Sequence, residues 1–269
     1  MSKSDAIKTF RDLLSFLTII PLAKTEDFLM TSAKHMYLFP VIGALIGVFA
    51  AGYYQLTVVV VSSVLGFVNG VVAFLPEALL VKAIPAAMTL AFLLVLTGLQ
   101  HFDGLVDLGN AIGLDKLEDR RAIAHAWTVT HKGAFLALAV EFLAFFGLFF
   151  LNVDFAFRVI IGAEISAKLA MVTVTWIGRP AHTGLGARFV ETVHMKKRHV
   201  LAYVLSGLMI YPLLGVTGLG IVLLSVLSGI VMERIADRTF GGVSGDIIGA
   251  TNEATRTVML LVLASVFLL

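Results

Sequence analysis

Long apolar stretches with almost no charge constrain the fold of this chain more than any other feature. Residues 37–62 carry no charged side chain, and residues 79–100 carry one, Lys82. Stretches of about 20 apolar residues can cross a bilayer as helices. Only 14% of the residues are charged, against about 25% in a soluble domain, and the mean hydropathy is +0.97. We therefore predict an all-α polytopic integral membrane bundle, formed as a single domain by residues 1–269.

The apolar pattern predicts about seven transmembrane helices and one shorter N-terminal helix. The apolar piece at residues 13–23 is too short to span a bilayer, so we expect an interfacial or re-entrant helix there. The seven predicted spans are residues 37–62, 79–100, 133–151, 158–177, 199–213, 217–232 and 257–269.

Small residues and helix breakers predict how some of these spans pack. Gly43, Gly47 and Gly52 give the first span a small face for close helix contact. Pro212 and Gly215 interrupt the apolar run between the fifth and sixth spans, which predicts a hairpin there.

The basic residues predict the orientation of the chain in the membrane. Lysine and arginine are enriched in cytoplasmic loops, and here they precede the first span and follow the second, fourth and sixth. The loops at residues 63–78, 152–157 and 214–216 contain none. We expect a cell (cytoplasmic or inner) membrane protein with a cytoplasmic N-terminus, an external C-terminus and its polar, glycine-rich loops in the cytoplasm. The basic residues that carry this prediction are Lys3, Lys8, Arg11, Lys24, Lys34, Lys116, Arg120, Arg121, Lys132, Arg179, Arg188, Lys196, Lys197, Arg198, Arg234, Arg238 and Arg256.

Two features of the composition exclude classes of function. The chain has no cysteine, so it forms neither a disulfide framework nor a thiolate metal site. Its net charge of +2 does not favour a nucleic-acid partner.

A first candidate site follows the second predicted span, in the stretch HFDGLVDLGN at residues 101–110. If the helix continues through this stretch, Asp103 and Asp107 lie one turn apart on one face. Two such carboxylates repel each other unless a cation lies between them, and hard oxygen ligands suit Mg²⁺ or Mn²⁺ holding phosphate or diphosphate. The alternative is that Asp-Gly and Gly-Asn are turn formers that close a span.

A second candidate site is the stretch RTFGGVSGDIIGATNEATR at residues 238–256. Gly241, Gly245 and Gly249 are spaced four apart, and Asp246 and Glu253, seven apart, share a helix face. The glycines could admit phosphates, with the two acids as metal or substrate ligands. The alternative is a ridge of small residues that packs on a neighbouring membrane helix. Packing alone leaves the two acids unexplained, and acids at a membrane edge are candidates for function.

A third polar stretch, residues 178–199, contains Arg179, His182, Thr183 and Arg188 and could hold an anionic group. His131 and Lys132, at the start of the third span, could reach the same pocket.

Two acids within the spans, Glu141 and Glu164, leave a rival class of function open. Together with the acidic pairs they could serve a cation-coupled transporter. A transporter would often show two related halves, and the sequence shows no convincing internal repeat.

With these motifs in view, the chain resembles the cobalamin synthase family (adenosylcobinamide-GDP ribazoletransferase, cobalamin-5′-phosphate synthase). A family pattern similar to H-x-D-G-x-x-D-x-x-D-G corresponds here to His101, Asp103, Gly104, Asp107 and Asn110. A second, more specific pattern, similar to G-G-x-[ST]-G-D-x-x-G-A-x-x-E, is matched at every fixed position from residue 241 to 253. Weaker similarities at residues 16–22, 38–47 and 184–189 follow the family order, so the resemblance covers nearly the whole chain.

The chain departs from the family pattern at three places. Asn110 replaces the third acid of the first motif, and Ile19 stands where many members have arginine. The stretch HAWTVTHKGAF replaces a D-S-R-x-G-T-like segment before the third span. Lys132, within this stretch, would supply the positive charge of the family arginine that is missing here.

The resemblance implies a reaction, similar to that of CDP-alcohol phosphotransferases. The adenosylcobinamide phosphate of adenosylcobinamide-GDP passes to alpha-ribazole or its 5′-phosphate, GMP is released, and adenosylcobalamin or its 5′-phosphate is formed in the last step of nucleotide-loop assembly. Asp103 and Asp107 would hold Mg²⁺, or Mn²⁺, on the diphosphate. Asp246 and Glu253 would complete the metal site, or one of them would act as the base. Asp103, Asp107 and Asp246 form the expected catalytic group.

The resemblance also implies substrate contacts and partners. Arg238 and Lys132 would stabilise the anionic transition state or the leaving GMP. The expected partners are the two substrates and the bilayer; homo-oligomerisation and association with other nucleotide-loop enzymes are left open. Rivals in the same chemistry are phospholipid-type phosphotransferases and aspartate-rich prenyltransferases, whose own motifs are missing from the sequence. The expected substrate-binding residues are His101, Asn110, Lys132, Arg188, Arg238, Gly241, Gly242, Ser244 and Gly245.

Overall fold

The computed structural model describes residues 3–23, 27–72, 76–124, 126, 128–181 and 185–267. Within these ranges the chain is helical, and its one β-type pairing is an isolated bridge between Pro180 and Val243. The all-α prediction is therefore confirmed. The helices are α1 (Lys3–Leu17), α2 (Phe28–Lys34), η1 (Met36–Leu38), α3 (Phe39–Val72), α4 (Glu77–Leu96), α5 (Gln100–Ala111), α6 (Leu117–Ala124), α7 (His131–Phe149), α8 (Val153–Ile177), α9 (Leu185–His194), η2 (Lys197–Val200), α10 (Leu201–Phe240) and α11 (Gly245–Val266).

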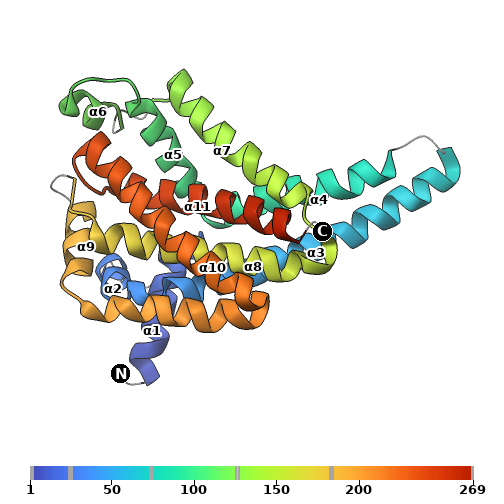
Figure 1. The fold of residues 1–269 in the computed structure, drawn as a ribbon, viewed down its shortest axis with the longest axis horizontal. Helices are drawn as coiled ribbons and strands as arrows, with labels where there is room; N and C mark the ends of the chain where they lie inside the picture. Colours follow the sequence, from blue (N-terminus) through green and yellow to red (C-terminus); the bar gives the residue numbers. More distant parts are fainter. Residues whose placement is uncertain are drawn as a thin grey trace.

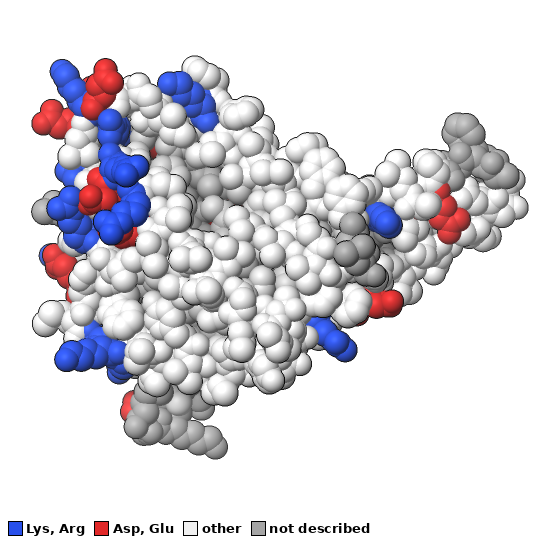
Figure 2. All heavy atoms as spheres, in the orientation of Figure 1, with Lys and Arg blue, Asp and Glu red and all other residues white. Residues whose placement is uncertain are grey.

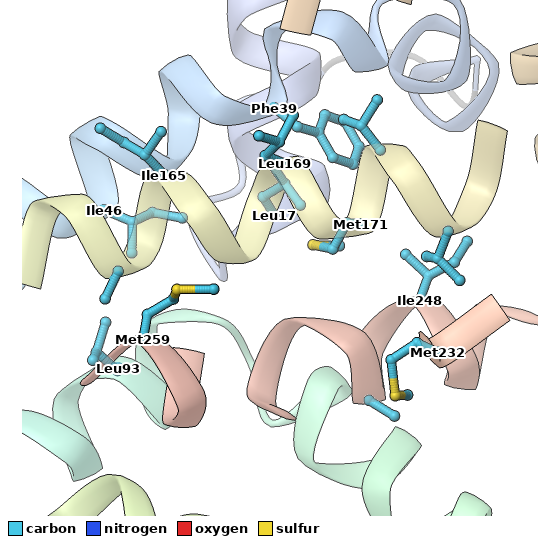
Figure 3. Packing of buried hydrophobic residues seen from close by; sticks show 14 of the residues in the cluster. Leu17, Phe39, Ile46, Leu93, Ile165, Leu169, Met171, Met232, Ile248 and Met259 are labelled. Carbon is cyan, nitrogen blue, oxygen red and sulfur yellow. The ribbon is translucent and has the colours of Figure 1, made fainter. Parts of the chain in front are cut away.

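Helix α8 forms the centre of the bundle (Figure 1). Every residue from Val159 to Thr175 is buried, as expected for a mainly apolar helix that is enclosed by others. It packs against α3, α10 and α11, and α11 in turn packs against α5 and α7. Leu169 of α8 and Phe39 of α3 lie among the buried side chains that join these helices (Figure 3).

Five helices of the described chain are long and apolar enough to cross a membrane, which supports the prediction of a membrane protein. Helix α8, which contains the predicted fourth span, is not one of them and lies inside the bundle. Helix α3 continues to Val72, beyond the predicted end of the first span at residue 62. The five candidates are Met36–Val71, Glu77–Leu96, His131–Phe149, Lys197–Phe240 and Gly245–Val266.

The predicted hairpin between the fifth and sixth spans is present within α10. The helix is broken at Gly215, whose φ of 59° and ψ of −139° are not helical. A methyl group at Gly218 would lie 2.8 Å from Cγ2 of Ile210, so the two arms face each other across the bend. Figure 1 shows α10 running in one direction and then returning.

Three further expected boundaries were wrong. The N-terminal helix is α1, which ends at Leu17, so the apolar residues 19–22 lie beyond it. The second span does not continue into the first motif, because Gly98 and Leu99 have φ values of 70° and 60° and separate α4 from α5. The last helix begins at Gly245 rather than at residue 257, because Ser244 caps it by accepting a hydrogen bond from the Ile247 amide at 3.3 Å.

Charged side chains gather at one end of the molecule. Figure 2 shows Lys, Arg, Asp and Glu concentrated over α6 and the nearby ends of α9 and α10, whereas the broad sides of this face are largely uncharged. Exposed Lys116, Glu118 and Asp119 belong to the α6 region. An uncharged belt beside a charged end is the surface expected of a bilayer-embedded bundle.

Two of the three glycines predicted to pack the first span do so. A methyl group at Gly43 would lie 2.7 Å from the Glu164 carbonyl oxygen, and one at Gly47 would lie 2.7 Å from Cα of Ile161. Gly52 has no such neighbour within 4 Å, so the prediction was wrong at that position. The contact between α3 and α8 therefore depends on Gly43 and Gly47.

Replacing Gly47 with alanine should destabilise the protein by about 1–3 kcal/mol, because the methyl group overlaps α8. Gly52→Ala on the same helix is the matched control and should be neutral or stabilising by up to about 1 kcal/mol, since alanine is the better helix former. Thermal unfolding in detergent, followed by circular dichroism, measures both. Equal effects of the two substitutions would contradict the assigned packing.

Candidate active site

Glycines allow α5 and α11 to approach closely, and this contact builds the site. A methyl group at Gly104 of α5 would overlap the carbonyl oxygen of Asp246, and one at Gly249 of α11 would lie 3.0 Å from Cα of His101. Small residues at a helix contact bring the two backbones together. The packing and the functional interpretations of these glycines are thus compatible, because their contact places Asp246 beside the first motif.

Asp103, Asp107 and Asp246 line one cavity of about 390 Å³. Burial, followed by the negative charges of Asp246 and Asp103, raises the pKa of Asp107 to about 7. Burial and the charge of Asp246 also raise the pKa of Asp103. The structure thus brings the three expected catalytic residues together as a cluster of mutually repelling carboxylates. The cavity is completed by Gln100, Val106, Ala124, Thr128 and Val129.

The described walls of this cavity contain no lysine or arginine. Lys132 instead donates a hydrogen bond from Nζ to the Ile112 carbonyl at 2.9 Å. Arg188 and Arg238 are exposed on α9 and α10 and lie outside the described lining. The substrate contacts expected of these three side chains stay predictions, since none of the three lines the cavity as described.

Two arginines of α6 take a different role. Arg120 Nη1 donates to the Arg238 carbonyl at 2.8 Å, and Arg121 Nη2 donates to the Phe240 carbonyl at 2.7 Å. Helix C-termini present unpaired carbonyls and attract cations. These bonds fix α6 to the end of α10, beside the cavity wall that Ala124 contributes.

Asn110, which replaces the third acid of the motif, holds the chain rather than facing the cavity. Its Nδ2 donates to the Thr128 carbonyl at 2.8 Å. Its Oδ1 accepts from the Thr130 amide at 2.9 Å and from the Thr130 hydroxyl at 2.8 Å. The amide group of Asn110 is thus bonded to the loop that supplies Thr128 and Val129 to the cavity, and its expected substrate contact stays a prediction.

The glycines of the second motif mainly shape the turn between α10 and α11. Gly241 (φ 71°) caps α10, and Gly242 (φ 153°) lies against Arg179, whose carbonyl accepts from the Val243 amide at 2.7 Å. Neither glycine belongs to the described lining of a cavity, and Ser244, the cap of α11, does not either. Ser244 also donates to Oδ2 of Asp246 at 3.2 Å, so it orients this carboxylate.

Glu253 is buried and paired, and its expected role as a metal ligand stays a prediction. It forms an ion pair with Arg256, accepts from Asn252 Nδ2 at 3.0 Å and lies 3.5 Å from Nδ1 of His101. Only 1% of its side chain is exposed, and it is outside the described lining of the aspartate cavity. Glu253 lies two helical turns beyond Asp246 on α11, and at that depth the same face of the helix is buried in the core.

The same buried cluster uses the charged residues of α8. Glu164 lies 2.5 Å from Nε of Arg256 and 2.9 Å from Nζ of Lys168, and Lys168 also donates to Asn252 at 2.8 Å. The sequence suggested Glu164 as a transporter acid and Arg256 as a loop cation. Both are instead buried partners that join α8 to α11.

A second cavity, of about 280 Å³, adjoins the first and shares Gln100 and Asp246 with it. Among the predicted residues, His101 and Gly245 line this second cavity. Gln100 lines both cavities and was not predicted; its position next to the first motif was its only sequence signal. His182 and Thr183 lie outside the described residues.

The chain is similar to known proteins over nearly its full length. A family model described as cobalamin-5-phosphate synthase matches residues 9–264. The adenosylcobinamide-GDP ribazoletransferase of Methanocella arvoryzae is 31% identical, with 95% of each chain covered. The protein of that name from Methanococcoides burtonii is 29% identical over 97% of this chain and 93% of its own, and the one from Pyrococcus furiosus is 33% identical over 71% and 83%. No solved structure matches the chain.

Breaking the buried ion pairs should destabilise the protein strongly. Arg256→Met leaves two buried carboxylates without their shared partner, and loss of one member of a buried pair costs about 3–5 kcal/mol. Arg179→Met removes an exposed pair with Asp237 and should cost less than about 1 kcal/mol. Unfolding midpoints in detergent compare the two variants. A small effect of Arg256→Met would show that the buried cluster contributes little to stability.

Proposed function

The chain belongs to the cobalamin-5-phosphate synthase family, and on this basis we propose that it transfers the adenosylcobinamide phosphate of adenosylcobinamide-GDP to alpha-ribazole or its 5′-phosphate. GMP is the second product, and the reaction belongs to cobalamin biosynthesis. One observation carries the assignment to a site: the three aspartates of the two family-like motifs converge on one cavity.

The reaction needs positioning and charge neutralisation more than covalent help from the protein. The oxygen of an acceptor ribose hydroxyl forms a bond to the phosphorus that bears adenosylcobinamide. The bond from that phosphorus to the oxygen of the GMP leaving group breaks, and the hydroxyl proton passes to a carboxylate of the site or to water. Such transfers depend on in-line geometry and on stabilisation of the charge on the phosphoryl and leaving groups.

We propose that a divalent cation, Mg²⁺ or Mn²⁺, is part of the site. The carboxylates of Asp103, Asp107 and Asp246 are the hard oxygen donors that such ions prefer, and no basic side chain in the described lining could neutralise a diphosphate instead. The described residues contain no group of three His, Asp or Glu side chains able to enclose a metal by themselves. Substrate oxygens and water would therefore complete the coordination, as is usual for Mg²⁺. When bound, the cation neutralises charge on the diphosphate and on the leaving group.

The residues of the chain divide the remaining work by position. Asp103 and Asp107 lie on α5 at the side of the cavity next to α6, and we assign them to the diphosphate and its cation. Asp246 borders both cavities and has a carboxylate oriented by Ser244. It is placed to orient the attacking hydroxyl toward the phosphorus.

We propose that the charged end of the molecule faces the cytoplasm. The positive-inside rule places basic loops there, and the aspartate cavity lies at this end, because Ala124 of α6 and Thr128 line it. Both substrates would then enter from the cytoplasmic side.

The test is GMP release by purified protein in detergent, with adenosylcobinamide-GDP, alpha-ribazole and Mg²⁺. EDTA should abolish release and added Mg²⁺ should restore it. Asp103→Asn should lower kcat/KM by about 100-fold or more, the usual effect of removing one group that stabilises transition-state charge. Asp115→Asn, a change of the same kind at an exposed acid beyond α5, should leave the rate unchanged.

Each outcome bears on a different part of the proposal. A folded wild type without turnover would favour another diphosphate transferase. Turnover that is insensitive to Asp103→Asn would keep the reaction and refute the assigned role of the aspartates. Activity in detergent, where no ion gradient exists, would also separate the enzyme from a cation-coupled transporter.

A further inference from the structure

The second cavity has an aromatic and apolar wall that the transfer of a phosphoryl group does not itself require. Phe16 of α1 and Phe189 of α9 stack with ring centroids 5.3 Å apart and an interplanar angle of 14°. Met30 of α2, Met171 of α8 and Ile248 of α11 extend this surface. Flat aromatic and flexible thioether side chains suit a planar apolar ligand.

The polar groups of this cavity lie where it meets the aspartate cavity. Gln100 and Asp246 line both cavities. His101, in the first turn of α5, lines only the apolar cavity. Ligands in the two cavities would therefore meet at Asp246. A nucleoside fits such a division, since its base is apolar on both faces and its ribose is polar.

We propose that this cavity binds the base of the acceptor nucleoside, a planar, weakly polar, benzimidazole-type heteroaromatic ring. The ribose would pass between Gln100 and Asp246, so that its hydroxyl faces the diphosphate in the aspartate cavity. This inference rests on the proposed function. It adds where the acceptor binds and which helices determine its identity.

The other parts of the two substrates fit the cavity less well. Guanine carries several donors and acceptors that would each need a partner, and unpaired polar groups are costly to bury. The described lining offers only Gln100, His101 and Asp246 as polar side chains, all at one edge. A corrin ring is much larger than a space of about 280 Å³.

The direct test is equilibrium binding of alpha-ribazole to the purified full-length chain in detergent, by titration calorimetry. Met30→Trp fills the cavity and should weaken binding by about tenfold or more, equivalent to about 1.4 kcal/mol of binding free energy. Met195→Trp is the matched control at a residue that is 80% exposed and should change binding by less than about twofold. Met30→Ala, a smaller disturbance, should weaken binding several-fold. If the unfolding midpoint shows that Met30→Trp does not fold, Met30→Ala tests the same wall of the cavity.

The readouts separate this inference from the proposed function, because binding is measured without turnover. In GMP-release assays of a functional enzyme, Met30→Trp should raise KM for alpha-ribazole and leave KM for adenosylcobinamide-GDP within about twofold. Unchanged ribazole binding in both Met30 variants would overturn the inference, and the cavity would then hold another apolar group, such as a lipid chain. Weakened binding of GMP with unchanged binding of ribazole would assign the cavity to the leaving nucleotide and would overturn it as well.

Discussion

The close contact between α5 and α11 is the constraint on which the rest of the site depends. Gly104 lies against the backbone of Asp246, and Gly249 lies against that of His101. Because both contacts are with backbone atoms, a side chain at either glycine would push the two helices apart. The carboxylates on the two helices are therefore held at one cavity, although their mutual repulsion favours separation. Close packing therefore keeps the three carboxylates near one another, although the repulsion between their charges opposes this arrangement.

Charge inside the bundle is tolerated because it is paired. Glu164, Lys168, Glu253 and Arg256 form a connected cluster of ion pairs beneath the site. Buried pairs contribute little net stability, since desolvation offsets much of their attraction, but they penalise any arrangement that leaves one member alone. The cluster thus fixes how α8 and α11 face each other, and it leaves the carboxylates of Asp103, Asp107 and Asp246 unpaired with any of its cations.

The spacing of residues in the sequence predicted which side chains share a face of one helix. It did not predict the contacts that form between two helices. The aspartates Asp103 and Asp107 could be placed from their separation by one turn, and Asp246 from its motif. Glu253 shares a helix face with Asp246, but its neighbours in the sequence do not indicate that Arg256 pairs with both Glu253 and Glu164. Asn110 likewise required knowledge of the loop that folds back onto it. Phe16 and Phe189 lie in the weaker family similarities at residues 16–22 and 184–189. Their stacking could not be predicted, because only the tertiary fold brings α1 beside α9.

The two adjoining cavities are built from largely different helices. Apart from the shared Gln100 and Asp246, the aspartate cavity is lined by α5, α6 and the loop before α7, whereas the stacked wall of the other comes from α1 and α9, with contributions from α2 and α8. Mutations in the second set can change which ring is accepted without displacing the acids. This separation makes the acceptor preference evolvable, because substitutions on α1, α2 and α9 leave the three aspartates in place.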